Sequence, residues 1–388
     1  MEVRQLTMTE RLDAVRIARI AFHVHQAEEP KLPSEPPQDE DWGAFADSGE
    51  MMAHILNNRF TVYLDGHTVP CGGIGAVSTL PEYRETGAIR AIFSRLLPSA
   101  YASGEVLSAL YPFNHAFYRK FGYETVTMSR IYEFAPQRLR GYRFKGEARR
   151  YREGDPAAPY TAMYNRFAAA YNLAAVRDDA CMLKPHLHDD SGTGRKFTYL
   201  LRNGGRDLAY LTYTDVYADP QARLKVEDVA WDGRDGFRAI LGFLGRFTAD
   251  YSAIELTLPL GIELLPLLAC DNLYDVKCTT HVGYMVRAVN AQRLLSAISL
   301  PEGCSYTIRV SDDLIAQNNA VYRVDASGAA VTADAPDLEA DVRALAQLCV
   351  GAVSLREALL RDDVELHANA ETLHRVFPGK PLYMAEHF

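Results

Sequence analysis

The chain has 388 residues, 48% of them hydrophobic and 23% charged, which suits two or three domain cores and excludes extensive disorder. Its formal net charge of -9, without any local run of Lys and Arg, excludes a surface made to neutralise nucleic-acid phosphates. We therefore expect no nucleic-acid partner. The acidic balance favours cationic partners such as amines, although acidic surfaces also commonly serve solubility alone.

The cysteines and the N-terminal residues show no sign of secretion. The six cysteines are scattered without a CxxC pair, as expected for reduced thiols. Residues 1–19 mix charged and apolar side chains, so they match neither a signal peptide nor a membrane-spanning segment. We expect a cytoplasmic protein that has no membrane partner.

Residues 1–140 are predicted to form a first mixed α/β domain. An N-terminal helix is predicted to face a core with Leu12, Val15, Ile20 and Phe22. The proline-rich residues 27–41 then indicate a loop. The elements that follow are a hairpin over 59–77 turning at Asp65-Gly66, a helix with the apolar stripe Ile89, Ile92, Phe93, Leu96 and Leu97, a strand over 105–111, a short helix over 115–120 and a long strand over 123–134.

Residues 141–289 repeat this order of elements more loosely, so we expect a second, related domain. The elements are a helix over 159–171, strands over 197–203, 207–215 and 223–231, a helix over 234–248 and a strand over 252–258. Ile89-Arg90-Ala91-Ile92-Phe93 matches Phe237-Arg238-Ala239-Ile240-Leu241, and each segment opens a helix directly after a strand. This shared setting favours a duplication.

Residues 290–388 are predicted to form a third module. It has strands over 305–310 and 320–325, a helix carrying Leu338, Val342, Leu345 and Leu348, and a helix over 355–360. The last eight residues, Pro381 to Phe388, are too apolar for a trailing disordered end. We expect them to pack inward.

The stretch from Val77 to Arg90 combines the features of an anion site. A strand ends, a short loop supplies Arg84 and Gly87, and a helix begins, so unpaired N–H groups and the positive helix end converge. Gly87 lets the backbone approach a phosphate, while Arg84 and Arg90 add charge. The loop matches neither GxxxxGK[ST] nor GxGxxG, which disfavours nucleotide hydrolysis and hydride transfer. The alternative to a pyrophosphate cradle is a plain strand-to-helix turn.

A second motif follows the next strand. R-x-x-G-A-I-R at residues 84–90 and F-Y-x-x-F-G-Y at residues 117–123 together resemble the acetyl-CoA binding and catalytic segments of the GNAT superfamily of N-acetyltransferases. The whole chain resembles the Eis (enhanced intracellular survival) type. Further matching segments are Pro81-Glu82-Tyr83-Arg84, Leu110-Tyr111-Pro112-Phe113-Asn114, Met285-Val286-Arg287 and the closing phenylalanine. The resemblance implies an α/β (α+β) fold with two tandem GNAT domains, 1–140 and 141–289, followed by a sterol-carrier-like domain over 290–388.

The resemblance also implies which residues hold acetyl-CoA, the expected cosubstrate. The amides of Val77 and Thr79 would hold the acetyl-pantetheine arm, and residues 85–90 would wrap the pyrophosphate. Phe113 and Asn114 occupy the place where many members present a Ser-Glu pair, so backbone contacts are expected there. The full expected set is Val77, Ser78, Thr79, Arg84, Glu85, Thr86, Gly87, Ala88, Ile89, Arg90, Phe113 and Asn114.

Direct attack of an amine on a thioester needs a base for the amine proton, a donor for the oxyanion and an acid for the thiolate. Tyr118 is the predicted acid, and an N–H at or next to Val77 is the predicted oxyanion donor. No Glu or His in the first domain lies in a motif that requires the role of base. The resemblance implies the α-carboxylate of Phe388, acting through water. The alternatives are a packed tyrosine and a packed terminal aromatic ring.

We expect no cofactor in the second domain and no metal. The loop over 230–237 is shortened and has lost the P-x-x-R-x-x-G spacing, so this domain is expected to shape the substrate cavity. His186, His188, Asp189 and Asp190 alternate in a charged loop that is more typical of solvated side chains than of a metal site.

Three functions compete. The first is acetylation of a primary amine on a small cationic substrate, of aminoglycoside, polyamine or lysine type. The second is binding of a lipid or another apolar ligand by the sterol-carrier-like domain, with the GNAT folds as scaffold. The third is a structural hub, since the resemblance implies homo-oligomers, specifically hexamers. Intact Arg84, Gly87 and Tyr118 favour the enzyme, whereas substrate identity depends on a cavity shaped by all three domains.

Overall fold

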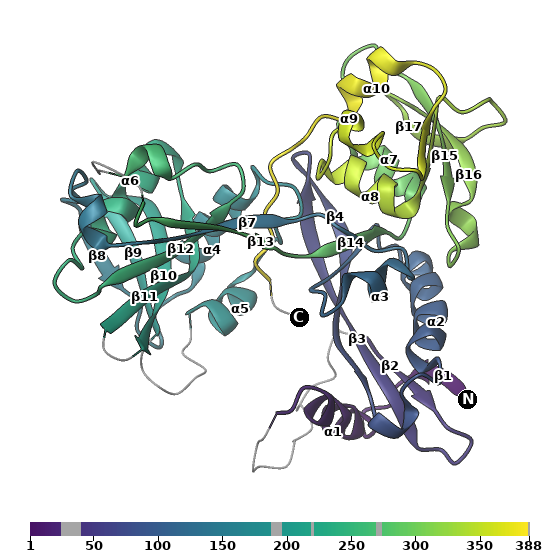
Figure 1. The fold of residues 1–388 in the computed structure, drawn as a ribbon, viewed down its shortest axis with the longest axis horizontal. Coiled ribbons are helices and arrows are strands. Elements are labelled where there is room, and N and C mark those ends of the chain that lie inside the picture. The colour runs from purple at the N-terminus through teal and green to yellow at the C-terminus, as the bar shows by residue number, and fades with distance from the viewer. Residues whose placement is uncertain (25–39, 188–195, 219–220, 269–273, 387–388) are drawn as a thin grey trace. The chain divides into compact units, whose positions relative to one another are not determined.

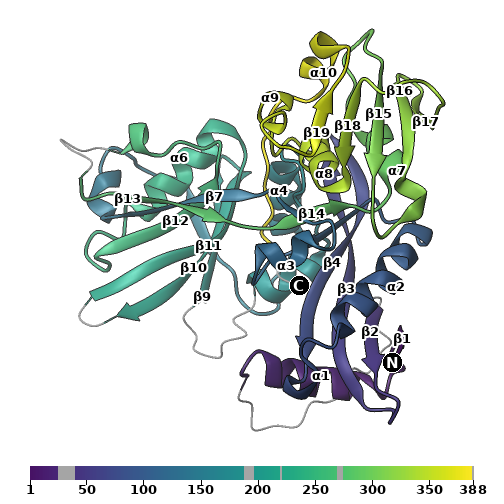
Figure 2. The same cartoon turned by 45° about the vertical axis from the view of Figure 1, so that its right-hand side comes forward.

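The computed structural model describes residues 1–24, 40–187, 196–218, 221–268 and 274–386. Two compact units are present (Figures 1 and 2). The first combines residues 1–127 and 283–380 with Glu386, and the second combines residues 128–282 with 381–385. The division into domains over 1–140, 141–289 and 290–388 stays a prediction. Within the described residues, the helices are all too short or too polar to cross a membrane.

A seven-stranded sheet forms the first part of the first unit, in the order β1-β2-β3-β4-β5-β14-β6. Its strands are β1 (Glu2–Gln5), β2 (Glu40–Phe45), β3 (Met51–Leu64), β4 (His67–Thr79), β5 (Leu107–Leu110), β6 (Glu124–Thr125) and β14 (Met285–Ala288). β3 and β4 form the predicted hairpin, and both turn residues, Asp65 and Gly66, have the positive φ that such a turn requires. β4 and β5 run parallel, while the other neighbours run antiparallel.

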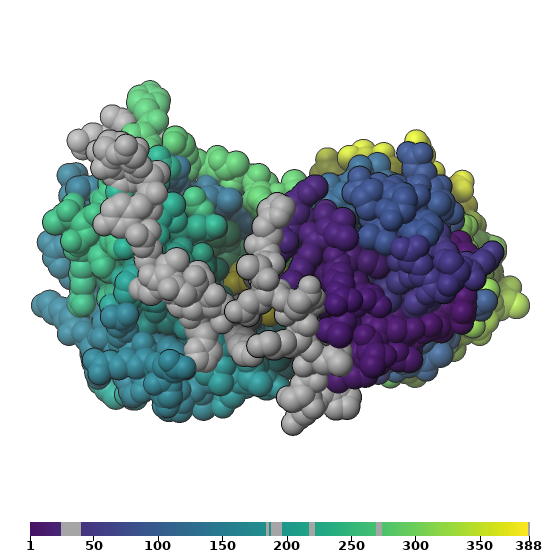
Figure 3. Space-filling view, turned by 90° about the horizontal axis from the view of Figure 1, so that it is seen from below, coloured from purple at the N-terminus to yellow at the C-terminus, as the bar shows by residue number. Residues whose placement is uncertain are grey.

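The helices of this part are α1 (Arg11–Ala21), α2 (Ala88–Ala102) and α3 (His115–Arg119). The predicted stripe of α2 is confirmed, because Ile92, Phe93, Leu96 and Leu97 are buried in the core that α2 shares with the sheet. The predicted core face of α1 is wrong. Ala14 and Ile17 are the buried residues, whereas Val15, Ile20 and Phe22 are 41 to 54% exposed. The N-terminal segment that contains this helix lies at the surface of the first unit (Figure 3, purple). The helix turns Ala14 and Ile17 inward, where they pack with Phe45 and Met51, and it lies against β3 and β4.

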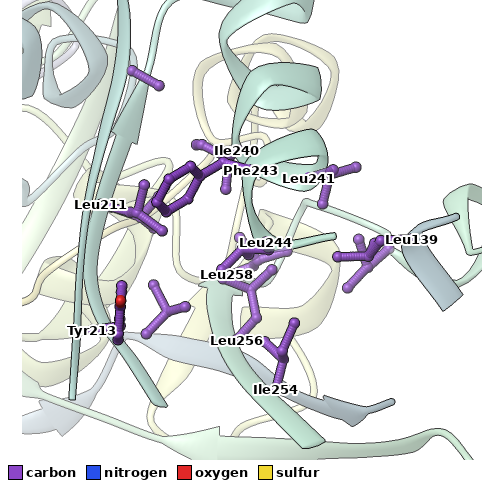
Figure 4. Close-up of a cluster of buried hydrophobic side chains, with 14 of the residues drawn as sticks. Leu139, Leu211, Tyr213, Ile240, Leu241, Phe243, Leu244, Ile254, Leu256 and Leu258 are labelled. Carbon is purple, nitrogen blue, oxygen red and sulfur yellow. The ribbon is translucent and has the colours of Figure 1, made fainter. Parts of the chain in front are cut away.

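The second unit contains a sheet in the order β13-β7-β12-β11-β10-β9-β8. Its strands are β7 (Met128–Phe134), β8 (Glu147–Arg150), β9 (Lys196–Asn203), β10 (Arg206–Ala218), β11 (Gln221–Trp231), β12 (Ala253–Pro259) and β13 (Lys277–Val282). Its helices are α4 (Ala158–Ala168), α5 (Asp179–Cys181), a π-helical turn over Met182–Leu187 and α6 (Gly233–Leu244). Figure 4 shows the core, where Phe243 of α6 lies beside Leu211 of β10 and Leu244 lies beside Leu258 of β12, while Leu241 points toward Leu139.

The two sheets have the same topology. When the second order is reversed, β8, β9, β10, β11, β12, β7 and β13 correspond to β1, β2, β3, β4, β5, β14 and β6. In each sheet the single parallel pair, β4-β5 or β11-β12, is bridged in sequence by the helix α2 or α6. The matching pentapeptides lie in these two helices, and Phe93 and Leu241 are both buried. The predicted tandem fold is therefore confirmed.

The chain leaves the first sheet before that sheet is complete and returns to it after forming the second sheet. The sequence predicts one strand over 123–134, but the structure breaks it after Thr125. β6 stays in the first sheet, while β7 pairs with β12 and β13 in the second. The chain returns at Gly283, and β14 then inserts between β5 and β6. The first sheet is therefore not continuous until β14 has joined β5 to β6.

The third part carries a five-stranded sheet, in the order β17-β16-β15-β18-β19. Its strands are β15 (Tyr306–Ser311), β16 (Ala320–Asp325), β17 (Gly328–Val331), β18 (Leu338–Asp341) and β19 (Val364–Leu366), and its helices are α7 (Ala291–Ala297), α8 (Val342–Val350), α9 (Leu355–Ala358) and α10 (Ala370–Val376). Leu338, predicted to be helical, lies on β18, because Asp341 caps α8 by accepting hydrogen bonds from the N–H groups of Arg343 and Ala344. α8 packs on β14 and β6, which ties this part to the first sheet.

Candidate functional site

The site begins where β4 separates from β5. The parallel pairing of the two strands ends at Ile74 and Leu110. The register of β4 against β3 then shifts between Gly75 and Ser78, and Ala76 has a φ of 49° in the left-handed region. A bulge with a strained non-glycine residue re-aims the strand at this point. The backbone of Gly75, Ala76 and Val77 consequently lines a pocket in place of a neighbouring strand.

A cavity of about 700 Å³ extends from this strand end along the N-terminus of α2. Ten of the twelve predicted cofactor-binding residues line it: Val77, Ser78, Thr79, Arg84, Glu85, Gly87, Ala88, Ile89, Arg90 and Phe113. The other two do not line it. Thr86 donates its hydroxyl hydrogen to the carbonyl oxygen of Tyr83 at 2.7 Å, and Asn114 caps α3 by accepting from the N–H of Phe117 at 3.0 Å.

The loop before α2 has the backbone of an anion cradle. Gly87 is the N-cap of α2 with a φ of 86°, and no heavy atom lies within 4 Å of the position a Cβ would take. Glu85 also has a positive φ, of 66°. Left-handed residues of this kind turn backbone N–H groups to one side, and α2 adds the positive end of its dipole. The loop thus provides open space and donors for a pyrophosphate.

Three cationic side chains line the same cavity: Arg84, Arg90 and Lys120. None of them forms an ion pair with a carboxylate in the described part of the chain. Arg90 lies over the ring of Phe121 at 5.7 Å from the ring centroid. Cations that have no carboxylate partner among the described residues suit a ligand that carries several phosphates, as coenzyme A does.

A second pocket of about 330 Å³ adjoins the first and shares Phe22, Val77 and Phe113 with it. The full lining is Phe22, Ile74, Gly75, Ala76, Val77, Tyr111, Pro112, Phe113, Tyr118, Tyr284 and Glu386. Glu386 is the charged member of this set. A thioester carried by the strand end at Val77 would stand between the two pockets.

Tyr118 is placed in this second pocket by α3 and by the aromatic rings around it. Its side chain is 2% exposed, and its ring lies 5.3 Å from that of Phe113, 5.2 Å from that of Phe117 and 6.3 Å from that of Tyr123. Burial raises the pKa of Tyr118 well above its usual value near 10. The phenol therefore stays protonated and can act as a donor.

Phe388 lies outside the described residues. The tail is described as far as Glu386, which lines the pocket of Tyr118 and accepts a hydrogen bond at its carbonyl oxygen from the hydroxyl of Tyr284. The predicted acid and the end of the described tail therefore meet in one pocket of the first unit.

Sequence reasoning missed Phe22, Lys120 and Tyr284 as pocket residues. Lys120 follows Phe117 by three positions on the turn of α3, so helical spacing could have suggested that both reach the cofactor cavity. Phe22 and Tyr284 carry no motif. They reach the site because α1 ends beside β4 and because β14 returns next to β5.

Comparisons with known proteins agree with this architecture. Residues 2–126 match the model of a GNAT acetyltransferase domain, and residues 291–385 match the model of a sterol carrier protein domain. The chain is thus similar to GNAT acetyltransferases over about its first third and to sterol carrier proteins over about its last quarter. A search of curated proteins finds no match.

Solved structures show that the Eis-type fold extends over the whole chain. A GCN5-related N-acetyltransferase from Anabaena variabilis is 19% identical with a TM-score of 0.86, and each chain is covered to 100%. A probable N-acyltransferase from Enterococcus faecalis is 20% identical with a TM-score of 0.85, over 100% of this chain and 99% of the other. Eis1 from Mycobacterium abscessus is 20% identical with a TM-score of 0.83, and each chain is covered to 100%.

The second GNAT-like half of the Eis-type fold has no comparable loop. Asp232 alone separates β11 from α6, whereas residues 80–87 separate β4 from α2. The ring of Trp231 packs at 4.5 Å from that of Phe167 and at 4.9 Å from that of Phe237, which fills the strand end. Tyr383 of the tail also packs on Phe167, at 5.5 Å.

No three His, Cys, Asp or Glu side chains group as metal ligands in the parts of the chain that the structure describes. His186 is described, and its Nδ1 lies 3.2 Å from Asp228, which also pairs with the buried Arg177. His188, Asp189 and Asp190 lie outside the described residues.

Proposed function

We propose that the chain transfers the acetyl group of acetyl-CoA to a primary amine of a small cationic substrate, of aminoglycoside, polyamine or lysine type. The observation that carries this proposal is the convergence of Val77, Tyr118 and Glu386, the last described residue of the tail, in the lining of one pocket. Such a pocket brings together a strand edge for the thioester, a proton donor and the end of the tail.

In the proposed reaction the amine nitrogen attacks the thioester carbonyl carbon and the C–S bond breaks. A backbone N–H at or next to Val77 stabilises the negative charge that develops on the carbonyl oxygen. The sulfur leaves as a thiolate and takes the phenolic proton of Tyr118. Burial of Tyr118 keeps that proton in place until a thiolate forms nearby.

The proposed base is the α-carboxylate of Phe388. Phe388 follows Glu386 by two residues, a separation that spans at most about 7 Å. A carboxylate has a low reference pKa, so it would act through water on an amine that is already losing its proton. Support for this role comes from the position of Glu386 in the pocket of Tyr118.

The lining of the acceptor pocket supports a cationic substrate. Phe22, Tyr111, Phe113, Tyr118 and Tyr284 contribute aromatic rings, and Glu386 is the charged residue among the described residues that line the pocket. Aromatic faces and a carboxylate both favour an ammonium group over an anion. A cytoplasmic location and a homo-oligomer, specifically a hexamer, stay predictions.

Free-thiol release from acetyl-CoA, measured with polyamines, aminoglycosides and lysine peptides, tests the proposal. We expect amine-dependent turnover, and we expect Tyr118→Phe to lower kcat roughly 100-fold because it removes the proton donor. The KM for acetyl-CoA should change little, since the cradle at Arg84 and Gly87 is intact. Tyr274→Phe is the matched control, because that side chain is 98% exposed. If the Tyr118→Phe variant keeps wild-type kcat, the assignment of the acid is wrong.

The pH profile is a second expectation for the same residue. Because the pKa of Tyr118 is raised, its phenol remains protonated from pH 7 to 10. Loss of the Tyr118 proton should therefore not lower kcat between pH 7 and 10. The pH profiles of wild type and Tyr118→Phe should have the same shape in this range. Profiles of kcat for both proteins with one saturating amine check this point.

A further inference from the structure

A groove in the second unit gathers positive charge. It has a volume of about 660 Å³, and its described lining residues differ from those of the cofactor cavity and the acceptor pocket. Three separate segments contribute to it: residues 143–145 before β8, residues 203–208 around the turn from β9 to β10, and residues 235–239 in α6. All three segments belong to the second unit.

The lining of the groove has four cationic side chains and one carboxylate. The cations are Arg143, Lys145, Arg206 and Arg238, and the carboxylate is Asp235. Within the described residues, none of these five side chains forms an ion pair. The chain as a whole has a net charge of -9, so a concave surface with an excess of unpaired cations is unusual for it. This local charge favours an anion as the occupant.

The contacts that these cations do make leave their charge uncompensated. Arg238 lies over the ring of Tyr142 at 5.1 Å from the ring centroid, and Nη1 of Arg143 donates to the carbonyl oxygen of Tyr142 at 3.4 Å. Asp207 on β10 pairs with Arg202 of β9 at 2.5 Å, so its carboxylate is already engaged. A ligand can therefore supply the missing negative charge.

The walls of the groove are fixed by close backbone contacts with α6. A Cβ on Gly242 would lie only 2.6 Å from the backbone nitrogen of Phe144. A Cβ on Gly236 would overlap the carbonyl oxygen of Leu208. The side chain of Arg246 also donates to the carbonyl oxygen of Phe144 at 2.6 Å. The segments before β8 and at the start of β10 are thus held against one helix, which keeps the groove in shape.

The groove combines exposed charges with an apolar floor. Leu208 and Ala239 are buried and Phe144 is half-buried, whereas all four cations are exposed. The turn at Gly204 adds open space, because no heavy atom lies within 4 Å of the position that its Cβ would take. A ligand can therefore lie on the floor while several of its charged groups reach the cations around it.

We propose that this groove binds a small polyanion that carries two or more linked phosphate groups. Three guanidinium groups and one ammonium group match the several charges of an oligophosphate, and a guanidinium can donate two hydrogen bonds to one phosphate. The volume of about 660 Å³ lies in the range of small-molecule sites. This inference does not rest on the proposed acetyl transfer, because it uses no residue of the cofactor cavity or the acceptor pocket.

Isothermal titration calorimetry of the full-length protein with inorganic tripolyphosphate and with ATP tests the groove. The cofactor cavity also carries cations, so the reference protein has Arg84→Gln, Arg90→Gln and Lys120→Gln. We expect the reference protein to bind one equivalent of tripolyphosphate. Adding Arg206→Gln and Arg238→Gln should raise the Kd at least about tenfold, because two charge-assisted contacts are lost.

A second pair of substitutions tests another wall of the same groove. Arg143→Gln with Lys145→Gln should also raise the Kd at least about tenfold. The matched control is Lys225→Gln with Arg356→Gln, which removes the same charge at exposed positions outside the groove. The control should keep the Kd of the reference protein, and thermal unfolding should be the same in all of these proteins.

The two probes distinguish the sources of the phosphates. Equal Kd values for tripolyphosphate and ATP would support recognition of the phosphate chain alone, whereas tighter binding of ATP would support an added contact of the nucleoside with the apolar floor. The proposal is overturned if neither probe binds the reference protein. It is also overturned if both groove variants keep the Kd of the reference protein, or if the control loses as much affinity as they do.

Discussion

The pKa of Glu105 is raised, as the pKa of a catalytic carboxyl group often is, yet Glu105 lies away from the candidate site. It is 4% exposed beside Cys71, at the end of the β4-β5 pair opposite to Val77. Burial raises the pKa of Glu105 to about 7, although the amide of Asn57, which donates to it at 2.9 Å, and the nearby Arg59 lower it. The second carboxyl oxygen and the amide oxygen of Asn57 are both buried beside Gly72. A protonated Glu105 can donate to that oxygen, so the neutral form fits this position.

Replacing Glu105 should flatten the pH dependence of stability. The folded-state pKa is raised above the reference value of 4.5, so the folded state binds the proton more tightly than the unfolded state. Its contribution is fully present below pH 4.5 and is lost as the pH rises through about 7, a change of about 3 kcal/mol. Glu105→Gln keeps the neutral shape and should be more stable than wild type at pH 8.

Urea unfolding at pH 5 and pH 8 checks this expectation. The difference between wild type and Glu105→Gln should grow from pH 5 to pH 8, whereas the exposed Glu302→Gln should follow wild type at both. A constant difference would mean that Glu105 titrates normally. The comparison with Tyr118 shows that a raised pKa by itself does not identify a catalytic residue.

Strand β14 joins three elements through one buried arginine. Arg287 is fully buried; its Nη1 donates to the carbonyl oxygen of Phe121, just after α3, at 2.6 Å, and its Nη2 pairs with Asp312. Asp312 also accepts from the N–H of Leu314 and from the side chain of Asn318, each at 2.9 Å. The strand therefore connects the end of the helix that carries Tyr118 to the third part of the chain.

Replacing either Arg287 or Asp312 alone should lower the free energy of unfolding. Arg287→Met leaves the Asp312 carboxylate buried without its cation, and Asp312→Asn does the reverse, so each should lower the free energy of unfolding by about 3 to 5 kcal/mol. The double variant should lose less than the sum of the two, because neither charge is then stranded. Urea unfolding of the four proteins measures the coupling. Arg323→Met, in the half-exposed pair with Asp334, is the control and should change the midpoint little. Additive losses would show that Arg287 and Asp312 act separately.

The second sheet is formed by one continuous segment of the chain, whereas the first sheet needs a strand from beyond that segment. All seven strands of the second sheet lie within residues 128–282, whereas the first sheet takes β14 from beyond that segment. In addition, α8 covers β14 and β6, and the side chain of Gln347 on α8 donates to the carbonyl oxygen of Thr125 at 2.7 Å. The first sheet is therefore incomplete until the third part of the chain has been added.

Two fragments should behave differently for this reason. Residues 128–282 should give a cooperative unfolding transition, because the fragment keeps every strand and the core around α6. Residues 1–127 should not, because β5 and β6 lose the strand that joins them and expose their edges. Circular dichroism with urea titration distinguishes the two. A cooperative transition in residues 1–127 would contradict the requirement for β14.

Local patterns in the sequence predicted the elements that build the cofactor cradle. The apolar stripe of α2 is set by its 3.6-residue period, and the turn at Asp65-Gly66 is set by residues that accept a positive φ. The spacing of Arg84, Gly87 and Arg90 places them at one helix start, so no long-range contact was needed to expect a common cavity. The pentapeptide shared by α2 and α6 also pointed to the duplication, since equivalent helices bury equivalent positions.

Tertiary structure decided everything that depends on partners distant in sequence. The residues over 123–134 alternate as a single strand would, and pairing partners more than a hundred positions away determine that β7 leaves the first sheet. The inward face of α1 was missed because its buried residues include the small Ala14, which adds little to an apolar pattern. Tyr284 and Glu386 meet because β14 inserts beside β5 and the tail returns to the same pocket. Side-chain periodicity reports which face of an element is buried, but it carries no information about what buries it.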